Sequence, residues 1–421
     1  MSDDPELAGK RVLVVGLARS GRAAAEALVS RGAVVVGYDR NEELEAGRLE
    51  ELGVEVHLGP EEETLLQGSE LLVKSPGVPG ATPLVTRARE RSIPIWSEIE
   101  LGARLLANPI LGVTGTNGKT TTSELLGAMF RAGGQRVEVA GNVGRPLTGL
   151  AGAVSSEAWV ICELSSFQLE DVLSLRPRIA VLLNLEPDHL DRHETYERYT
   201  ETKLRIFENQ TADDVAVVPR DFAPVPGAAR RVEFRFDDPL PAEPRIPGPH
   251  NRENAAAAAA AARAAGLDDR AIAEGLRTFP GVPHRIELVR ELAGVRYVND
   301  SKATNVAAAR RALASFPDSR LHVILGGLGK VEPYTPLAAS FKRGDRAYLI
   351  GDAAPPIAEA LAAAGVPFVR SGDLASAFAE AASAASGGDV VLLSPACASY
   401  DQFENFEARG DAFRRLAQEL R

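Results

Sequence analysis

The stretch GVTGTNGKTTT, residues 112–122, places a lysine and three threonines directly after a glycine-rich turn. The strict phosphate-loop motif has a glycine, four residues and then Gly-Lys-Ser/Thr, but Val113 stands where that first glycine belongs. The physical basis is nevertheless present, because backbone N–H groups at a helix N-terminus surround phosphates, Lys119 neutralises their charge and Thr120 can bind Mg²⁺. An apolar strand precedes the turn, so we predict a nucleotide-phosphate site rather than a turn with only a structural role.

Two further clusters suit metal-assisted chemistry on phosphates. Glu163 ends an apolar run, at the edge of a sheet where α/β proteins bind ligands, and its carboxylate could hold a metal ion. The alternative is a solvated carboxylate before a helix-capping Ser-Ser pair. Another apolar run leads into a segment rich in acids and histidines, with Asp188, His189, Asp191 and His193. Its spacing does not match a zinc site, so we expect one histidine beside Mg²⁺ or substrate. Lys203, one helix further on, would by itself be a solvated helix lysine.

Apolar strands alternate with helical stretches along the chain, which predicts parallel sheets covered on both faces by helices. The first block contains a helix at 20–32 and strands at 11–16, 33–39, 53–59, 70–77 and 93–97. The second contains strands at 109–115, 136–141, 157–165, 179–186 and 214–219, a proline-rich loop at 237–251 and an alanine-rich helix at 255–262. The third contains strands at 295–300, 321–327, 345–351 and 389–394 and an amphipathic helix at 405–420. We therefore predict an α/β chain of three domains, 1–97, 98–281 and 282–421.

Length and composition limit the function. With 421 residues the chain is long enough for two or three domains, and its formal net charge of −11 argues against broad binding to nucleic acid, which needs a basic surface. Its two cysteines, Cys162 and Cys397, leave no disulfide framework and favour a reducing compartment. The acidic N-terminus lacks the apolar core of a signal peptide and no long apolar run occurs, so we expect a cytoplasmic protein without a membrane span.

The turn GLARSG, residues 16–21, resembles a dinucleotide-binding fingerprint, but Ala18 replaces the glycine that lets a pyrophosphate approach the backbone. Asp39 ends the next strand, where an acid can hydrogen-bond a ribose. Both facts fit a nucleotide that is held differently from NAD, and a plain packing turn is the alternative. In the third block, three polar segments each follow a strand: NDSKATN (299–305), GGLGK (326–330) and SPACASYDQFENFE (394–407). Together they suggest a closing domain that brings a cation and hydroxyl groups to a substrate carboxylate.

These motifs, in this order, resemble the Mur ligase family over essentially the whole chain. The phosphate loop has the family's form G-x-T-G-T-N-G-K-[ST], which accounts for the offset from the strict spacing. Thr120 stands where folylpolyglutamate synthetases usually carry glycine, and Asn117 stands where the alanine-adding relative usually has histidine. The turn GLARSG with SPGVP (75–79), and the C-terminal SPACASYDQFENFEARG, are most similar to the branch that adds D-glutamate. The resemblance implies a Rossmann-like N-terminal domain, a P-loop ATPase-type central domain and a Rossmann-like C-terminal domain.

The resemblance also implies roles for individual residues. The implied catalytic residues are Lys119, Glu163, His189 and Lys203. The implied ligands of two Mg²⁺ ions are Thr120, Glu163, His189 and, once CO₂ has carbamylated it, Lys203. The implied ATP contacts are Gly115, Thr116, Asn117, Gly118, Lys119, Thr120, Thr121, Asn251, Asn254, Arg285 and Asp300. The implied contacts of the UDP-muramoyl substrate are Ala18, Arg19, Asp39, Arg40, Ser75, Pro76, Gly77, Val78, Asn142, Ser165, Ser166 and Gln168. Those of D-glutamate are Thr304, Lys330, Ser399 and Phe406.

The implied reaction is the ATP-dependent addition of D-glutamate to UDP-N-acetylmuramoyl-L-alanine through an acyl phosphate, a step of peptidoglycan precursor synthesis. Such a step serves cell-wall biogenesis, cell shape and cell division. ATP, two Mg²⁺ ions and a lysine carbamate are the expected cofactors, and we expect a monomer whose partners are small molecules. The nearest alternative is another Mur ligase or a folylpolyglutamate synthetase-like ligase. Other classes remain open: a P-loop kinase with a hydroxyl acceptor, a nucleotide-gated regulator without turnover, or a Rossmann oxidoreductase that holds NAD(P) or flavin.

Overall fold

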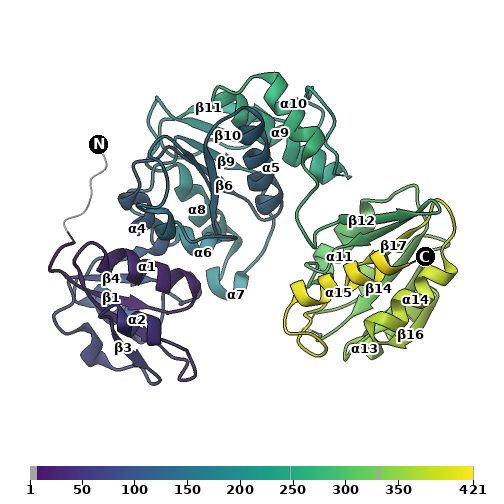
Figure 1. Cartoon of the computed structure of the whole chain (residues 1–421), viewed down its shortest axis with the longest axis horizontal. Helices are drawn as coiled ribbons and strands as arrows, with labels where there is room; N and C mark the ends of the chain where they lie inside the picture. Colours follow the sequence, from purple (N-terminus) through teal and green to yellow (C-terminus); the bar gives the residue numbers. More distant parts are fainter. Residues whose placement is uncertain (1–6, 247, 330–331, 421) are drawn as a thin grey trace. The chain divides into compact units, whose positions relative to one another are not determined.

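The structure, a computed structural model, describes residues 7–246, 248–329 and 332–420. Over these residues the strands form three sheets, and the chain divides into two compact units (Figure 1). The first unit comprises the chain up to Glu243 together with Glu253–Arg277, and it contains the N-terminal and central sheets. The second unit comprises Pro244–Arg252 and the chain from Thr278 onward, and it contains the third sheet. Parallel strands alternate with helices in each unit, which confirms the predicted α/β class.

The N-terminal sheet is parallel throughout, in the order β3-β2-β1-β4-β5. Its strands are β1 (Arg11–Val15), β2 (Val34–Asp39), β3 (Glu55–Leu58), β4 (Leu71–Lys74) and β5 (Ile95–Ser97). The connecting helices are α1 (Arg19–Val29), α2 (Gly47–Glu51), η1 (Glu63–Leu66) and α3 (Pro83–Glu90). The strand order reverses between β1 and β4, so the turns after these two strands meet at the carboxyl edge of the sheet. Open α/β sheets bind ligands at this position.

The central sheet is also parallel, in the order β11-β10-β9-β6-β8-β7. Its strands are β6 (Ile110–Thr114), β7 (Val137–Gly141), β8 (Trp159–Glu163), β9 (Ile179–Leu182), β10 (Val215–Pro219) and β11 (Arg230–Phe234). The accompanying helices are α4 (Glu98–Leu105), α5 (Lys119–Ala132), η2 (Thr148–Leu150), α6 (Ser166–Leu169), α7 (Leu190–His193), α8 (Tyr196–Leu204), η3 (Arg205–Phe207), α9 (Pro249–Ala264) and α10 (Asp269–Thr278). Strand order reverses at β6, which places the phosphate loop at a second ligand-binding edge.

Two features of the central sheet differ from the sequence prediction. Strand β11 was missed, because it is a mostly polar edge strand of which only Phe234 is fully buried. Helix α9 begins at Pro249, inside the segment 237–251 that was predicted to be an extended loop. Proline suits the first position of a helix, since its fixed backbone angle is already helical and its missing N–H costs nothing there.

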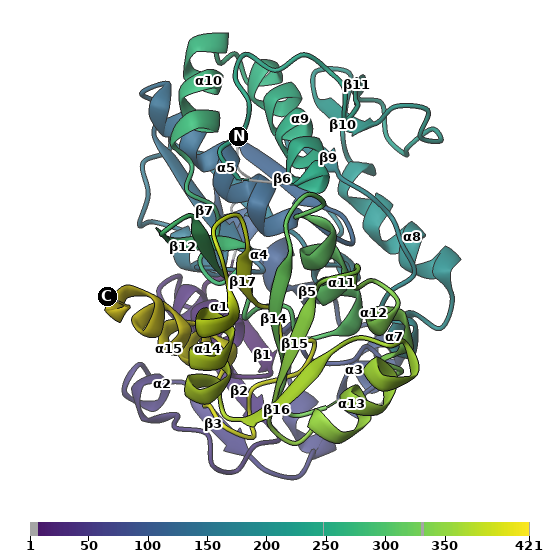
Figure 2. The same cartoon turned by 90° about the vertical axis from the view of Figure 1, so that its right-hand side faces the viewer.

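The third sheet has the order β12-β13-β17-β14-β15-β16. Its strands are β12 (Glu287–Leu292), β13 (Val295–Asn299), β14 (Leu321–Gly326), β15 (Arg346–Ile350), β16 (Phe368–Gly372) and β17 (Val390–Leu393). Its helices are α11 (Val306–Ala314), α12 (Thr335–Ala338), α13 (Ala354–Ala363), α14 (Leu374–Ala384) and α15 (Phe406–Glu419). Helices α14 and α15 lie next to each other over one face of this sheet (Figures 1 and 2).

Both edge strands of the third sheet, β12 and β16, were missed, because their side chains are only partly buried. Strand β12 pairs antiparallel with β13, so the third sheet is mixed, unlike the parallel sheet predicted for the first block. Ala293 and Gly294 between these strands both have positive φ, 51° and 77°. Such a pair forms the tight turn that joins two antiparallel strands.

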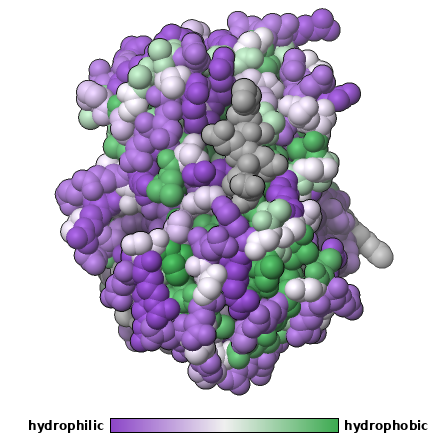
Figure 3. Space-filling view, turned by 90° about the vertical axis from the view of Figure 1, so that its left-hand side faces the viewer, coloured by the Kyte–Doolittle hydropathy of each residue, from purple (hydrophilic) through white to green (hydrophobic). Residues whose placement is uncertain are grey.

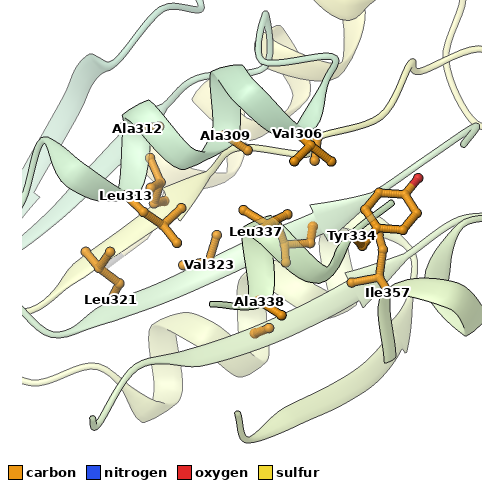
Figure 4. Packing of buried hydrophobic residues seen from close by; sticks show 14 of the residues in the cluster. Val306, Ala309, Ala312, Leu313, Leu321, Val323, Tyr334, Leu337, Ala338 and Ile357 are labelled. Atoms are coloured by element: carbon orange, nitrogen blue, oxygen red, sulfur yellow. The ribbon is translucent and has the colours of Figure 1, made fainter. Parts of the chain in front are cut away.

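On the face of the third sheet opposite α14 and α15, apolar side chains of two helices pack against the strands. Val306, Ala309 and Leu313 of α11 lie against Val323 of β14, with Leu337 of α12 beside them (Figure 4). The apolar residues of α11 recur at three- and four-residue spacing, so they share one face of the helix. The sheet is therefore buried on both faces, and its strand ends can carry polar loops.

The molecular surface carries no continuous apolar face in the view of Figure 3, where hydrophilic side chains predominate and hydrophobic residues form separate groups. In the part of the chain that the structure describes, none of the helices combines the length and hydropathy needed to cross a bilayer.

Candidate nucleotide and substrate site

The phosphate loop connects β6 to α5 and depends on two glycines. Gly115 has φ 153° and Gly118 has φ 82°, backbone conformations that residues other than glycine rarely adopt. A Cβ atom on Gly118 would lie 2.2 Å from Oδ1 of Asn254 in α9. The absence of side chains at these positions lets the backbone pass close to its neighbours and form a cradle at the N-terminus of α5. The first N–H groups of a helix have no partner within the helix, and this end suits an anion.

Three residues that the sequence prediction missed hold the loop in place. The side chain of Asn184 accepts a hydrogen bond from the Asn117 backbone N–H (2.9 Å), and its backbone oxygen accepts one from the Thr116 N–H (3.0 Å). Glu186 accepts a hydrogen bond from the Asn117 side-chain amide at 2.9 Å. The Tyr199 hydroxyl lies 2.9 Å from that of Thr116. Asn184 and Glu186 follow β9, a neighbour of β6. Their contact with the loop could have been predicted from the sequence, because polar residues that follow an adjacent strand lie at the same edge of the sheet.

Two lysines converge on the loop. The ammonium group of Lys119 donates hydrogen bonds to the carbonyl oxygens of Gly115 (2.8 Å) and Thr116 (2.9 Å), and that of Lys203 donates to the same Gly115 oxygen (2.9 Å). Lys203 is only 2% exposed. Burial, together with the positive charge of Lys119, lowers the pKa of Lys203 to about 6. Two amines at one carbonyl favour an anion between them. Lys203 is thus buried beside the phosphate loop and not the solvated helix lysine that its own segment would suggest.

The oxygen groups suited to a hard cation lie beside the loop. Glu163, at the end of β8, is buried and stands in register with Val113 of β6, while Thr120 is buried in the first turn of α5. One carboxylate oxygen of Glu163 accepts a hydrogen bond from the Asn142 side-chain amide at 2.9 Å. Over the described residues, no group of three acidic, histidine or cysteine side chains gathers as a metal cluster. A buried carboxylate and a buried hydroxyl beside the loop fit Mg²⁺, since Mg²⁺ commonly binds through few carboxylates plus phosphates.

The two histidines after β9 differ in their surroundings. His189 is about half exposed, has φ 51°, and its ring centre lies 4.7 Å from that of Phe167. His193 is buried with its Nε2 atom 3.0 Å from the Ser166 hydroxyl, and burial lowers its pKa. His189 therefore remains the one that can reach a ligand from solvent, while His193 packs within the unit.

A cavity of about 370 Å³ opens between the turns after β1 and β4 and extends to β7 and α6. The predicted substrate residues that line it are Ala18, Arg19, Asp39, Arg40, Ser75, Pro76, Gly77, Val78, Asn142 and Gln168. Tyr38, Glu61 and Thr82 line it too and were missed by the sequence prediction. Asp39 accepts hydrogen bonds from the backbone N–H groups of Leu17 (2.7 Å) and Asn41 (2.9 Å), so its carboxylate shapes the wall of the cavity.

Ser165 and Ser166, two other predicted substrate residues, are outside the lining of this cavity. Ser165 caps α6, accepting a hydrogen bond from the Gln168 N–H while the Gln168 side chain accepts one from the Ser165 N–H. This reciprocal pairing satisfies two N–H groups at the start of the helix. Ser165 thus positions the cavity residue Gln168, whereas the Ser166 hydroxyl lies against His193.

The predicted residues of the third block lie in the second unit, as do Asn251 and Arg285. Asp300 is buried, accepts hydrogen bonds from the Ser394 hydroxyl (2.9 Å) and the Ile286 N–H (3.2 Å), and burial raises its pKa to about 7. Phe406 begins α15, with the Lys302 ammonium 5.7 Å from its ring centre. Ser399 is buried and Thr304 is partly exposed. Lys330 lies outside the described residues.

Arg409 of α15 is a polar residue of this unit that the sequence prediction missed. It is fully buried, and its guanidinium donates hydrogen bonds to backbone or hydroxyl oxygens of Ser301, Cys397 and Ala398. Burial lowers its pKa to about 10. Its spacing from Phe406 and Phe413 puts it on the apolar face of the helix. This spacing is the feature of the sequence from which its burial could have been predicted.

Comparison with known proteins identifies the family. Three family models match the chain: the MurD-like N-terminal domain of Mur ligases over 10–97, the Mur ligase middle domain over 113–233, and the glutamate ligase domain of Mur ligases over 284–397. A protein of Anaeromyxobacter dehalogenans named UDP-N-acetylmuramoylalanine–D-glutamate ligase is 45% identical over 459 residues, covering 99% of both chains. The chain belongs to the Mur ligase family.

Solved Mur ligase structures share the fold. The MurF ligase of Thermotoga maritima, solved with ADP, is similar with a TM-score of 0.60 and 18% identity over 100% of this chain and 97% of that one. A folylpolyglutamate synthase/dihydrofolate synthase of Yersinia pestis, solved with AMPPNP and manganese, has a TM-score of 0.55 and 20% identity over 76% of this chain and 92% of that one. The family models and the 45%-identical relative confirm the family that the motifs predicted, and the solved structures confirm the fold. The roles of individual residues in this Mur ligase, and the three domain boundaries, stay predictions.

Proposed function

We propose that this Mur ligase joins D-glutamate to UDP-N-acetylmuramoyl-L-alanine with consumption of ATP, in peptidoglycan precursor synthesis. The name of the 45%-identical relative supports this choice of substrates. One contact carries the proposal structurally: Asn142 lines the substrate cavity and also donates a hydrogen bond to Glu163 beside the phosphate loop. A substrate that fills the cavity and reaches past Asn142 brings its carboxylate to the phosphates.

The reaction has two steps. A carboxylate oxygen of the L-alanine residue attacks the γ-phosphorus of ATP, the bond to the β,γ-bridging oxygen breaks, and ADP leaves. The amine of D-glutamate then attacks the acyl carbon, phosphate leaves with the C–O electron pair, and an amide forms after the amine loses a proton. Lys119 offsets the negative charge of the phosphates, and Asn142 and Glu163 orient the reacting ends. Thr120 and Glu163 would hold Mg²⁺, which would supply screening of the repulsion between the two anions.

The proposal includes a carbamate on Lys203. A neutral amine is needed to attack CO₂, and the burial and lowered pKa of Lys203 support a neutral amine at neutral pH. Attack forms an N–C bond, the nitrogen loses a proton, and the product carries an anionic oxygen pair. That pair would lie near Lys119 and, together with His189, would be expected to contribute to binding a second Mg²⁺.

The remaining assignments complete the proposal. The cavity of the N-terminal domain (1–97) holds the UDP end of the substrate, and the loop of the central domain (98–281), with Asn254, holds ATP. The C-terminal domain (282–421) supplies Arg285 and Asp300 toward the nucleotide and holds D-glutamate through Thr304, Lys330, Ser399 and Phe406. The enzyme acts as a monomer in the cytoplasm.

The decisive experiment scores phosphate release from ATP with each of a panel of amino acids. Release that requires both UDP-N-acetylmuramoyl-L-alanine and D-glutamate supports the proposal. Equal release with water alone, or with another amino acid in place of D-glutamate, contradicts it. Mass spectrometry of the product, which gains one glutamyl residue, distinguishes ligation from kinase activity on a hydroxyl.

A further inference from the structure

Arg192, in α7, is joined to the wall of the substrate cavity. Its guanidinium donates hydrogen bonds to the carbonyl oxygens of Pro76 (Nη1, 2.9 Å) and Val78 (Nη2, 3.1 Å). It also forms a two-point ion pair with Glu170, with Nε 2.8 Å and Nη2 2.6 Å from the two carboxylate oxygens. The ring of Phe167 lies 4.1 Å from the guanidinium carbon. Four acceptors and an aromatic face therefore fix this one side chain.

A second cation fixes the same stretch of wall. Residues 75–78, the cavity loop, follow directly after Lys74, the last residue of β4. Lys74 is 1% exposed, and its ammonium lies 3.1 Å from a carboxylate oxygen of Glu170 and 2.8 Å from one of Asp171. The cavity loop is thus held at its start by Lys74 and along its length by Arg192, and both cations meet at Glu170.

Arg192 is also linked, through Phe167, to His189, which we propose as a ligand of the second Mg²⁺. His189 lies three residues earlier in the chain, and the ring of Phe167 contacts both the His189 ring and the Arg192 guanidinium. Two segments that are far apart in the sequence, the cavity loop and residues 189–193 (the His189 segment), are therefore linked by one arginine. A buried ion pair is weak evidence for stability, because the loss of hydration offsets most of its attraction. Its geometry points instead to a role in alignment.

We propose that Arg192 is a positioning residue that keeps the cavity loop and the His189 segment in register, so that substrate in the cavity presents its carboxylate at the phosphate loop. This inference rests on the proposed function. Arginine is required because its planar fork reaches several acceptors at once, whereas the ammonium of lysine is a point charge on a flexible stem. Arg192 touches no reacting atom, so it acts through the segments that it aligns.

The test compares Arg192→Lys and Arg192→Gln with Arg198→Lys as the matched control. Arg198 lies in the next helix and pairs only with the exposed Glu194 among the ion pairs of the described residues, with side-chain exposures of 62% and 70%. Displacement of the cavity loop weakens its contacts with the UDP-substrate and misplaces the carboxylate, so we expect Arg192→Lys to raise KM for UDP-N-acetylmuramoyl-L-alanine about tenfold and to lower kcat. KM for ATP and D-glutamate should change by less than about twofold, because their contacts are elsewhere. Arg192→Gln should show the larger effect, and Arg198→Lys should match the wild type.

Calorimetry with UDP-N-acetylmuramoyl-L-alanine alone measures binding even where turnover is too slow to follow, and melting curves establish that each variant is folded. A folded Arg192→Lys protein with unchanged kcat, KM and binding overturns the inference, as does an equal rise in KM for all three substrates. A loss of kcat with KM unchanged supports it when the binding stoichiometry equals that of the wild type, because the substrate is then bound but misaligned. A reduced stoichiometry indicates a smaller active fraction and overturns it. If the wild-type protein binds the UDP-substrate but fails to ligate D-glutamate, the proposed function fails, and that result is separate from any difference between variants.

Discussion

The turn after β1 and the turn after β6 both join a central parallel strand to the N-terminus of a helix, and both contain a glycine with positive φ. In the turn after β6, two lysine side chains donate to the Gly115 carbonyl. In the turn after β1, the carboxylate of Asp39 accepts the Leu17 N–H, and a cavity of about 370 Å³ opens beside it. The backbone architecture therefore decides where a ligand can bind, while the side chains around each turn decide which ligand fits. The turn with two lysines at one carbonyl suits phosphates, and the turn beside a cavity lined by Arg19, Asp39 and Arg40 suits a larger nucleotide.

Removing the Lys119 cation of the turn after β6 should have the largest effect on activity. We expect Lys119→Met to lower kcat about 1,000-fold, because a preorganised cation at a developing phosphate charge contributes strongly to transition-state stabilisation. Binding of the UDP-substrate, measured by calorimetry, should be nearly unchanged. A variant that loses UDP-substrate binding as strongly as catalysis would show that the two turns do not act separately.

Lys203 tests whether its amine carries a carbamate. Lys203→Ala should lower activity about 100-fold, as loss of a metal-site group does, and added short carboxylates should restore part of it. In the folded protein the pKa of Lys203 is lowered to about 6, so the amine is neutral above this pH and protonated below it. Carbamate formation needs the neutral amine, and activity should therefore fall as the pH falls through about 6. Full activity of Lys203→Ala would remove the carbamate from the proposal.

Gly118→Ala tests the close approach of the β6 turn to α9. Gly134→Ala is the matched control, because Gly134 has a similar φ of 70° but a Cβ there would meet nothing within 4 Å. Gly134→Ala should lose about 1 kcal/mol of unfolding free energy, the cost of a side chain in left-handed backbone, and Gly118→Ala should lose more because its Cβ would also meet Asn254. Only Gly118→Ala should also displace Asn254 and raise KM for ATP, by about tenfold. Equal KM values for the two variants would contradict a cradle that requires glycine.

Asp39→Asn should give the smallest effect. The amide keeps one oxygen acceptor, so we expect the loss of one of two hydrogen bonds to backbone N–H groups, about 1 kcal/mol of unfolding free energy. KM for the UDP-substrate should rise about threefold while KM for ATP stays constant, since the change alters only the turn after β1. Steady-state kinetics with each substrate varied in turn measures this difference. A change confined to KM for ATP would reverse the assignment of the two turns.

The buried strands could be predicted from the sequence because a strand covered on both faces must be apolar along its length. Val12 to Val15 of β1 and Val160 to Cys162 of β8 are such runs. The edge strands β11, β12 and β16 could not, because one side of an edge strand faces solvent and its sequence is mixed. The antiparallel pairing of β12 follows from a two-residue turn at Ala293 and Gly294, which strand hydropathy does not report.

By itself the sequence determined the family and the chemistry that its motifs suit, because the phosphate loop is a continuous run in which residue type and spacing carry the information. The tertiary structure alone decided which side chains support that loop and the cavity beside it. Asn184 and Tyr199 reach the loop from 67 and 83 residues away, and Arg192 reaches Pro76 across 116. Each is an ordinary polar residue in its own segment. Only folding, which brings distant strand ends to one edge of a sheet, makes them partners.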